Sequence, residues 1–150
     1  MALDRPSKLD GDTIAAPADS TAARDVVSVS LPAVGAYLSL LRTATAGLAA
    51  RLDFTLDDIE DLRIAVDEAC AMLLAQAAPA ATLDCTFELF PAMMRVSVSV
   101  VTTDGLEPSR DTFAWTVLSA LAGAVDSSVD ADNRVTIELQ KQRPTYGDLS

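Results

Sequence analysis

The chain has 150 residues and a formal net charge of −11, and half of its residues are hydrophobic. This length suits one domain with its own core, and the acidic balance argues against a nucleic-acid-binding protein, which needs basic patches. No apolar run approaches the roughly 18 residues that a membrane-spanning helix needs, and the absence of histidine excludes serine–histidine and cysteine–histidine catalysis within the chain.

Residues 1–24 are rich in Ala, Asp, Ser, Thr and Pro and poor in large apolar side chains. This composition predicts a disordered leader, and no signal peptide is recognisable in it. The two cysteines, Cys70 and Cys85, are not spaced like metal ligands. We therefore expect both to be reduced, buried core residues of a cytoplasmic protein.

The domain is predicted over residues 25–141. Residues 26–31, VVSVSL, alternate around β-branched side chains and predict a strand. Apolar residues then recur at helical spacing from Val34 and predict an amphipathic helix over about 33–52. On its outer face Arg42 stands among small side chains such as Ser39 and Ala46. That face suits either a bidentate contact with a partner's carboxylate or simple solvent exposure of the arginine.

The strongest helical pattern runs from Thr55 to Gln76. Apolar residues recur there every three or four positions and predict a core face. Thr55 is the predicted N-cap, followed by aspartates at the positive end of the helix dipole. On the opposite face Glu68 is the last charge before the helix becomes apolar all round. This position predicts a half-buried carboxylate.

The start of this helix is strongly acidic. Such a run is typical of a solvated helix face, and it would also serve as a docking surface for a basic partner, because opposite fields speed association. The acids do not converge on one narrow face, so no metal site is predicted. Against the single base Arg63, the seven acids are Asp53, Asp57, Asp58, Glu60, Asp61, Asp67 and Glu68.

After Pro79 the pattern changes to a period of two, which predicts a β-hairpin that turns at Pro91-Ala92. Asp104-Gly105 predicts the next turn, and Trp115 lies in an apolar helical pattern, where a core position competes with a role as a ligand platform. From Lys141 onward the polar sequence predicts a frayed tail, with residues 142–150 outside the domain. The predicted elements are strands over 82–90 and 93–102, a helix over 113–121, and strands over 124–129 and 134–140.

The element order is β-α-α-β-β-α-β-β. It predicts an α+β two-layer sandwich in which helices cover one face of a mixed, mostly antiparallel sheet.

Residues 62–76, LRIAVDEACAMLLAQ, carry a family resemblance. They resemble the N-box region of bacterial anti-sigma factors of the serine-protein-kinase type, which have the GHKL (histidine-kinase-like) ATPase fold. That family reads L-x-x-A-V-x-E-A-x-x-N-x-x-x-H at this place. The resemblance implies that Glu68 matches the catalytic base, that Met72 replaces a magnesium-binding asparagine, and that Gln76 stands where histidine is frequent. Arg42 matches, more weakly, an arginine that the family uses against both the sigma factor and its antagonist.

The chain departs from the family at the nucleotide site. The family has an Asp-x-Gly-x-Gly box and a glycine-rich lid, whereas here only Asp104-Gly105 remains and residues 109–115 replace the lid. Backbone that wraps phosphate needs glycine, and Mg²⁺ needs an oxygen ligand that Met72 cannot supply. The resemblance thus implies a degenerate nucleotide pocket at Met72, Asp104 and Gly105, with Glu68 as a vestigial base and no cofactor expected.

The resemblance implies a cytoplasmic, stress-response anti-sigma factor that sequesters an alternative sigma factor through the face holding Ser39, Arg42 and Ala46. It also implies a homodimer, and release of the sigma factor when a STAS-type anti-anti-sigma protein competes. The alternative is an active kinase that uses ATP, Mg²⁺ and Glu68 to phosphorylate this antagonist on serine or threonine. A third reading is a GHKL-like scaffold that binds another small ligand near Met72, Asp104 and Trp115.

Overall fold

The computed structural model describes residues 25–144, so the leader predicted over 1–24 and the last residues of the predicted tail lie outside the described residues. The elements are β1 (Asp25–Pro32), a 3₁₀ turn η2 (Gly35–Tyr37), α2 (Leu38–Arg51), α3 (Leu56–Leu74), β2 (Thr82–Phe90), β3 (Met93–Val101), α4 (Phe113–Ala122), β4 (Ala124–Val129) and β5 (Arg134–Gln142).

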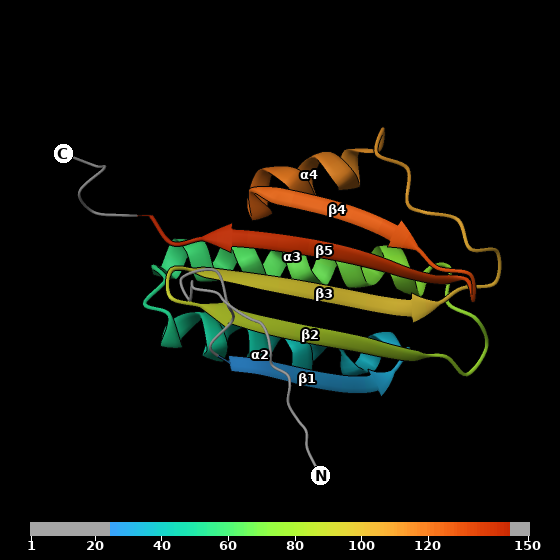
Figure 1. Ribbon diagram of the computed structural model, residues 1–150, viewed down its shortest axis with the longest axis horizontal. Coiled ribbons are helices and arrows are strands. Elements are labelled where there is room, and N and C mark those ends of the chain that lie inside the picture. The colour runs from blue at the N-terminus through green and yellow to red at the C-terminus, as the bar shows by residue number, and fades with distance from the viewer. Residues whose placement is uncertain (1–24, 145–150) are drawn as a thin grey trace, which may run out of the picture.

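The predicted two-layer α+β sandwich is confirmed. The strands form one sheet in the order β1-β2-β3-β5-β4 (Figure 1). Every neighbouring pair in it is antiparallel, so the prediction of a mixed sheet is wrong. The reason is that β3 and β4, which α4 connects, run in the same direction, but β5 returns between them and keeps them apart.

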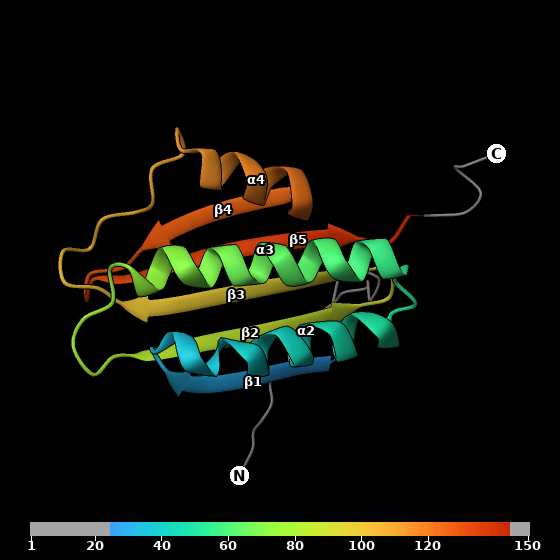
Figure 2. The same ribbon diagram turned by 180° about the vertical axis from the view of Figure 1, so that it is seen from behind.

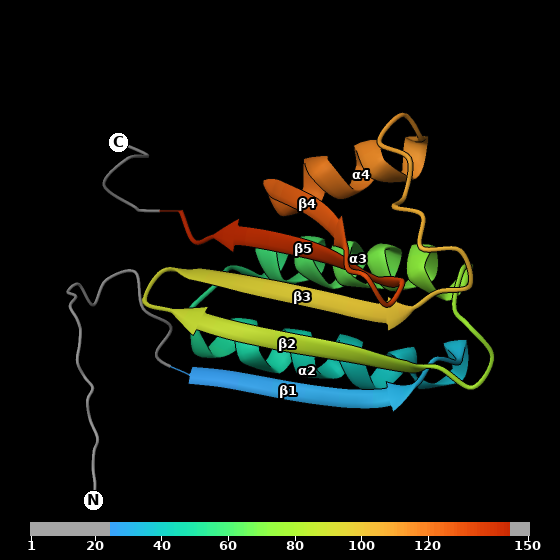
Figure 3. The same cartoon turned by 45° about the vertical axis from the view of Figure 1, so that its right-hand side comes forward.

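The helices lie on one face of the sheet, with α2 and α3 side by side across it and α4 beside the edge strand β4 (Figure 2). The oblique view shows the strands as one layer and the helices as the other (Figure 3). On the opposite face the strands present polar side chains to solvent. There Arg95 binds Glu138 at 2.9 Å and Glu88 at 3.2 Å, and Arg134 binds Asp84 at 3.1 Å. Because these charges are paired across strands, this face is stable without a covering layer among the described residues.

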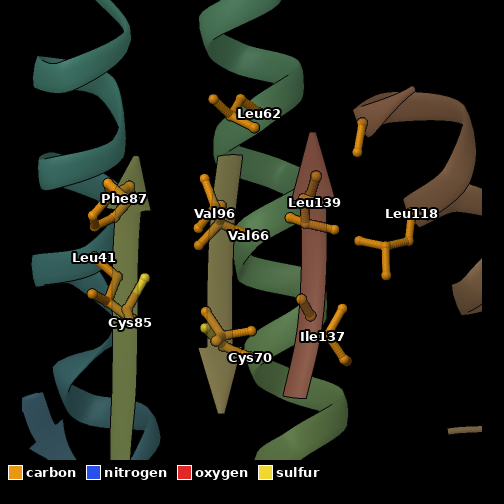
Figure 4. Packing of buried hydrophobic residues seen from close by; sticks show 14 of the residues in the cluster. Leu41, Leu62, Val66, Cys70, Cys85, Phe87, Val96, Leu118, Ile137 and Leu139 are labelled. Atoms are coloured by element: carbon orange, nitrogen blue, oxygen red, sulfur yellow. The ribbon is translucent and has the colours of Figure 1, made fainter. Parts of the chain in front are cut away.

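The core fills the space between the two layers (Figure 4). Alternate residues of β2, β3 and β5 point toward the helices, as the period of two requires. The core face predicted for α3 is confirmed, with Ile59 and Ala77 only partly buried. Its fully buried members are Leu62, Val66, Ala69, Cys70 and Leu73.

The first helix differs from its prediction at its start. The stretch predicted as one helix from about residue 33 is a 3₁₀ turn followed by α2. As a result Val34 and Tyr37, which share helical spacing with the core residue Leu41, are exposed. A 3₁₀ turn has three residues per turn, so side chains before it do not stay in phase with the α-helix.

Both cysteines are free and buried, as predicted. Burial, and secondarily the Asp67 carboxylate, raises the pKa of the Cys70 thiol to about 12. Burial also raises the pKa of Cys85. Both side chains are therefore thiols at neutral pH, and their role is packing rather than nucleophilic or redox chemistry.

Between residues 25 and 144, none of the helices combines the length and the apolar character that crossing a membrane would require. The strand β5 extends to Gln142, so Lys141, predicted to begin a frayed tail, pairs with Met94 of β3.

Candidate functional site

The residues of the predicted nucleotide pocket come from α3 and from the segment that joins β3 to α4. Thr55 caps the start of α3 as predicted, because its hydroxyl accepts a hydrogen bond from Asp58 N–H at 3.1 Å. At the other end, Thr103 N–H donates to the Gln76 carbonyl at 3.3 Å and Ala78 N–H donates to the Val101 carbonyl at 2.9 Å. The fold thus places the C-terminal end of α3 directly beside the start of this segment.

Glu68 and Met72 lie one turn apart on α3. Glu68 is half-buried, as predicted, and its carboxylate has no hydrogen bond or ion pair among residues 25–144. Met72 packs partly buried against the hydrophobic core. Its thioether contains no oxygen that could bind Mg²⁺.

The Asp104-Gly105 turn is held by internal hydrogen bonds. Gly105 N–H donates to the buried Thr102 hydroxyl at 2.8 Å, and that hydroxyl donates to the Asn133 carbonyl at 2.9 Å. Leu106 N–H donates to the Asp104 carboxylate at 3.2 Å. Gly105 has φ +69°, and a Cβ there would collide with the Asn133 side chain. Both the positive φ and the close approach of Asn133 favour glycine at this position of the turn.

The turn uses two of its backbone N–H groups for its own hydrogen bonds. Phosphate binding at such a turn uses free backbone N–H groups. Here the N–H groups of Gly105 and Leu106 are already bonded within the turn. Five surface hollows of the described part are lined by other residues, and none of the five includes Glu68, Met72 or Asp104.

Residues 103–112, here called the strap, lead from β3 to α4 and are tied to the edge strand β4. The last four of them begin the segment 109–115 that the resemblance sets against the family's lid. Arg110 donates from Nη2 to Asp126 Oδ1 at 2.8 Å and to Ser127 Oγ at 3.3 Å. Ser127 Oγ in turn donates to Glu107 Oε1 at 2.6 Å. The Arg110 guanidinium also lies 4.9 Å from the centre of the Trp115 ring. Two strap residues, Glu107 and Arg110, are therefore bonded to the neighbouring β4 residues Asp126 and Ser127.

Trp115 is a buried core residue, which favours the first of the two predicted interpretations. The Arg110 side chain covers its ring, and the Thr112 hydroxyl accepts from Trp115 N–H at 3.1 Å and caps α4. The role of Arg110 was not foreseen from the sequence, because its partners on β4 lie beyond α4 in the chain.

We expect the Arg110→Ala substitution to loosen the strap and raise its rate of proteolytic cleavage several-fold. The hydrogen bond from Arg110, and next that from Ser127 N–H, lowers the pKa of Asp126 from its usual 3.8. Because the folded pKa is the lower one, the stabilisation is present above pH 3.8 and is lost as the pH falls through the folded pKa. Limited proteolysis, with Arg51→Ala as control, and an NMR titration of Asp126 would measure both effects. An unchanged Asp126 pKa in the Arg110→Ala variant would contradict this prediction.

The three predicted partner-binding residues lie on α2. Ser39 is exposed, and Arg42 and Ala46 are partly exposed. Arg42 Nε lies 3.6 Å from Asp67 Oδ1 of α3, a long ion pair whose two side chains are both more than a third exposed. The Arg42 guanidinium is therefore accessible from solvent while it forms a long ion pair with Asp67.

The acidic residues in and just before α3 do not form one uncompensated negative surface. Most of them pair with bases from different parts of the chain, and residues 25–144 contain no group of three or more potential metal-ligating side chains. The pairs are Asp53 with Arg143, Asp58 and Asp61 with Lys141, Glu60 with Arg63, and Asp67 with Arg42.

Comparison with curated proteins finds relatives named serine-protein kinase RsbW. No protein-family model matches the chain. The chain is 32% identical over 90 residues to the serine-protein kinase RsbW of Halalkalibacterium halodurans, covering 59% of this chain and 54% of the relative. It is 46% identical over 46 residues to the RsbW of Bacillus velezensis, covering 31% and 29%. The matches therefore span about half or less of the length of these relatives.

A solved structure shares the fold. The RsbU and RsbW domains of Rv1364c from Mycobacterium tuberculosis match with a TM-score of 0.63 at 17% sequence identity. The match covers 81% of this chain and 34% of that chain. The chain is therefore similar in sequence to serine-protein kinases named RsbW, and it shares its fold with part of the structure of the RsbU and RsbW domains.

Proposed function

We propose that this chain is an anti-sigma factor that binds and sequesters an alternative sigma factor in a partner-switching system, without using nucleotide. The observation that carries the proposal is a contrast between two parts of an RsbW-like fold. The α2 face around Arg42 is open, whereas the strap, which leads from β3 to α4, is tied to β4.

Three features support a degenerate nucleotide site. Met72 stands in place of an oxygen ligand for Mg²⁺. The backbone donors of the Asp104-Gly105 turn are bonded within the turn. Arg110 holds the strap to Asp126 and Ser127. Phosphoryl transfer depends on positioning and on charge neutralisation around the phosphates, and these features provide neither.

The partner surface is supported by the α2 face and by the overall charge. Ser39, Arg42 and Ala46 offer a surface of small side chains with one cation, which lets a partner approach closely. The net charge of −11 would steer a basic, DNA-binding sigma factor toward the chain. A STAS-type anti-anti-sigma protein would release the sigma factor by competing for overlapping surface. Homodimer formation stays a prediction.

The test is a titration of purified alternative sigma factors of the source organism against the chain by calorimetry, without nucleotide. One of them is expected to form a stoichiometric complex, with an affinity that ATP and Mg²⁺ change less than twofold. The Ala46→Arg variant should lose the complex, because its long side chain blocks the face. Ala131→Arg, the same change at the exposed β4–β5 turn, should keep it. If every sigma factor fails to bind the unmodified chain, the proposal is wrong.

The second candidate is an active kinase. The half-buried Glu68 carboxylate favours it, because a catalytic base must be free of competing ion pairs and Glu68 has none with residues 25–144. Under this hypothesis ATP and Mg²⁺ bind with micromolar affinity, and Glu68→Ala or Asp104→Ala abolishes binding. The chain would also transfer phosphate to a serine or threonine of the antagonist. Under the main proposal, millimolar ATP gives no binding heat.

A further inference from the structure

A shallow hollow of about 450 Å³ lies on the helical layer between α2 and α3. Two arginines of different helices, Arg42 and Arg63, line it together with the small residues Thr43, Ala46 and Gly47. The small residues leave room for a side chain from outside. The hollow is therefore lined by two cationic side chains and three small residues.

Each of these arginines forms an exposed ion pair with an acid of α3. Arg42 Nε lies 3.6 Å from Asp67 Oδ1, and Arg63 Nη1 lies 2.7 Å from Glu60 Oε1. All four side chains are at least 36% exposed. Ion pairs at this exposure contribute little to stability, so the guanidinium groups can change partners at small cost.

We propose that this hollow is a receptor for an acidic side chain of the sigma factor, which binds between Arg42 and Arg63 and displaces Asp67 and Glu60. The inference rests on the proposed function and deepens it. It assigns Arg63 as a second recognition residue, and Asp67 as an internal competitor that sets the affinity.

Charge and shape select a carboxylate as the occupant. A planar guanidinium presents paired N–H donors that match the two oxygens of a carboxylate. An extended polyanion would bring many negative charges to Asp67, Glu60 and a chain with a net charge of −11, whereas one acidic side chain on a basic protein brings a single negative charge to the two cations. A lysine or arginine of the partner would be repelled from the hollow itself.

The role of Asp67 gives the proposal its sharpest consequence. If the acidic helix acted only through its overall field, removal of any of its charges would weaken the binding of a basic sigma factor. If Asp67 competes for Arg42, its neutralisation must strengthen binding. The two readings therefore predict opposite signs for the same variant.

The experiment measures the dissociation constant of the sigma factor that binds the unmodified chain in the calorimetric test above. Arg63→Ala is expected to weaken binding at least tenfold, because charge-assisted hydrogen bonds are lost. Its control, Arg51→Ala, removes the same charge at the exposed end of α2 and should change binding less than twofold. Arg63→Lys should recover only part of the loss, because the ammonium lacks the paired donors.

Asp67→Asn is expected to tighten binding about three-fold, whereas Asp57→Asn, at an exposed position in the first turn of the same helix, should not tighten it. In an Arg42→Ala background the gain from Asp67→Asn should vanish, which a double-variant cycle would show. Circular dichroism and unfolding midpoints of all variants confirm that the fold is intact.

The outcomes separate the two proposals. If the sigma factor binds but Arg63→Ala leaves the affinity within twofold, or Asp67→Asn weakens it, the receptor is overturned and the anti-sigma function stands. If no sigma factor binds the unmodified chain, the proposed function fails and the receptor fails with it.

Discussion

Replacing Phe87 with alanine is expected to lower the free energy of unfolding by about 3–5 kcal/mol, the range for large-to-alanine changes at fully buried aromatic positions. Phe87 is completely buried on β2, on the side of the sheet that faces the helices, near Leu41 of α2 (Figure 4). Its removal leaves a cavity that rigid strands and helices cannot close. Urea unfolding, followed by Trp115 fluorescence and far-UV circular dichroism, measures the loss.

The chain provides a matched control for this change. Phe113 begins α4 and is 82% exposed, so Phe113→Ala should alter the free energy of unfolding by no more than about 0.5 kcal/mol. Phe87→Leu keeps most of the buried volume and should cost less than Phe87→Ala. Equal losses in Phe87→Ala and Phe113→Ala would mean that the two layers do not pack as described.

Replacing Lys141 with methionine is expected to cost about 1.5–3 kcal/mol, since it removes a partner from three polar groups in a partly buried site. The Lys141 side chain is only 15% exposed. Its Nζ donates to the Leu121 carbonyl at the end of α4 at 2.8 Å and lies within 3.8 Å of Asp58 and 3.7 Å of Asp61 on α3. Lys141 thus joins β5 to two helices.

Methionine preserves the apolar stem of Lys141, so the variant isolates the loss of charge and hydrogen bonding. The double variant Lys141→Met/Asp61→Asn should recover part of the stability, because one uncompensated carboxylate is then neutral. Arg51→Met, at an exposed position on α2, provides the comparison and should fall within about 0.5 kcal/mol of the unmodified chain. A Lys141→Met chain as stable as Arg51→Met would show that the link between β5 and the helices is unimportant.

Much of the fold could be predicted because its signals are local. The step of three and four in α3, with Thr55 before it, predicts the core face and the N-cap that the structure confirms. The alternation around Pro91-Ala92 predicts the β2–β3 hairpin, in which Phe90 pairs with Met93. The helix predicted over 113–121 is α4, which ends at Ala122 before Gly123, where φ is +88°. Each of these features depends on residues within a few positions of one another.

The candidate site was predicted only in part. The sequence indicated Glu68, Met72, Asp104 and Gly105 from their place in a family pattern, and Arg42 from its small neighbours. It gave no reason to expect Arg63 and Arg42 in the same hollow, although Arg63 is conspicuous as the single base within an acidic run. The two arginines line one hollow because α2 and α3 lie side by side, which no local pattern encodes.

The sequence by itself determined the class of the chain: an acidic, histidine-free α+β domain whose strongest helical pattern begins at Thr55. Only the tertiary structure decided that β5 separates β3 from β4, that Arg110 ties the strap to Asp126, and that the partly buried Lys141 links β5 to two helices. The spacing of apolar residues can be read from neighbouring positions, because residues of one helix or strand share one backbone conformation. Contacts between residues far apart in the chain follow instead from how whole layers pack, and this is set by the balance of buried surface and paired charge over the entire domain.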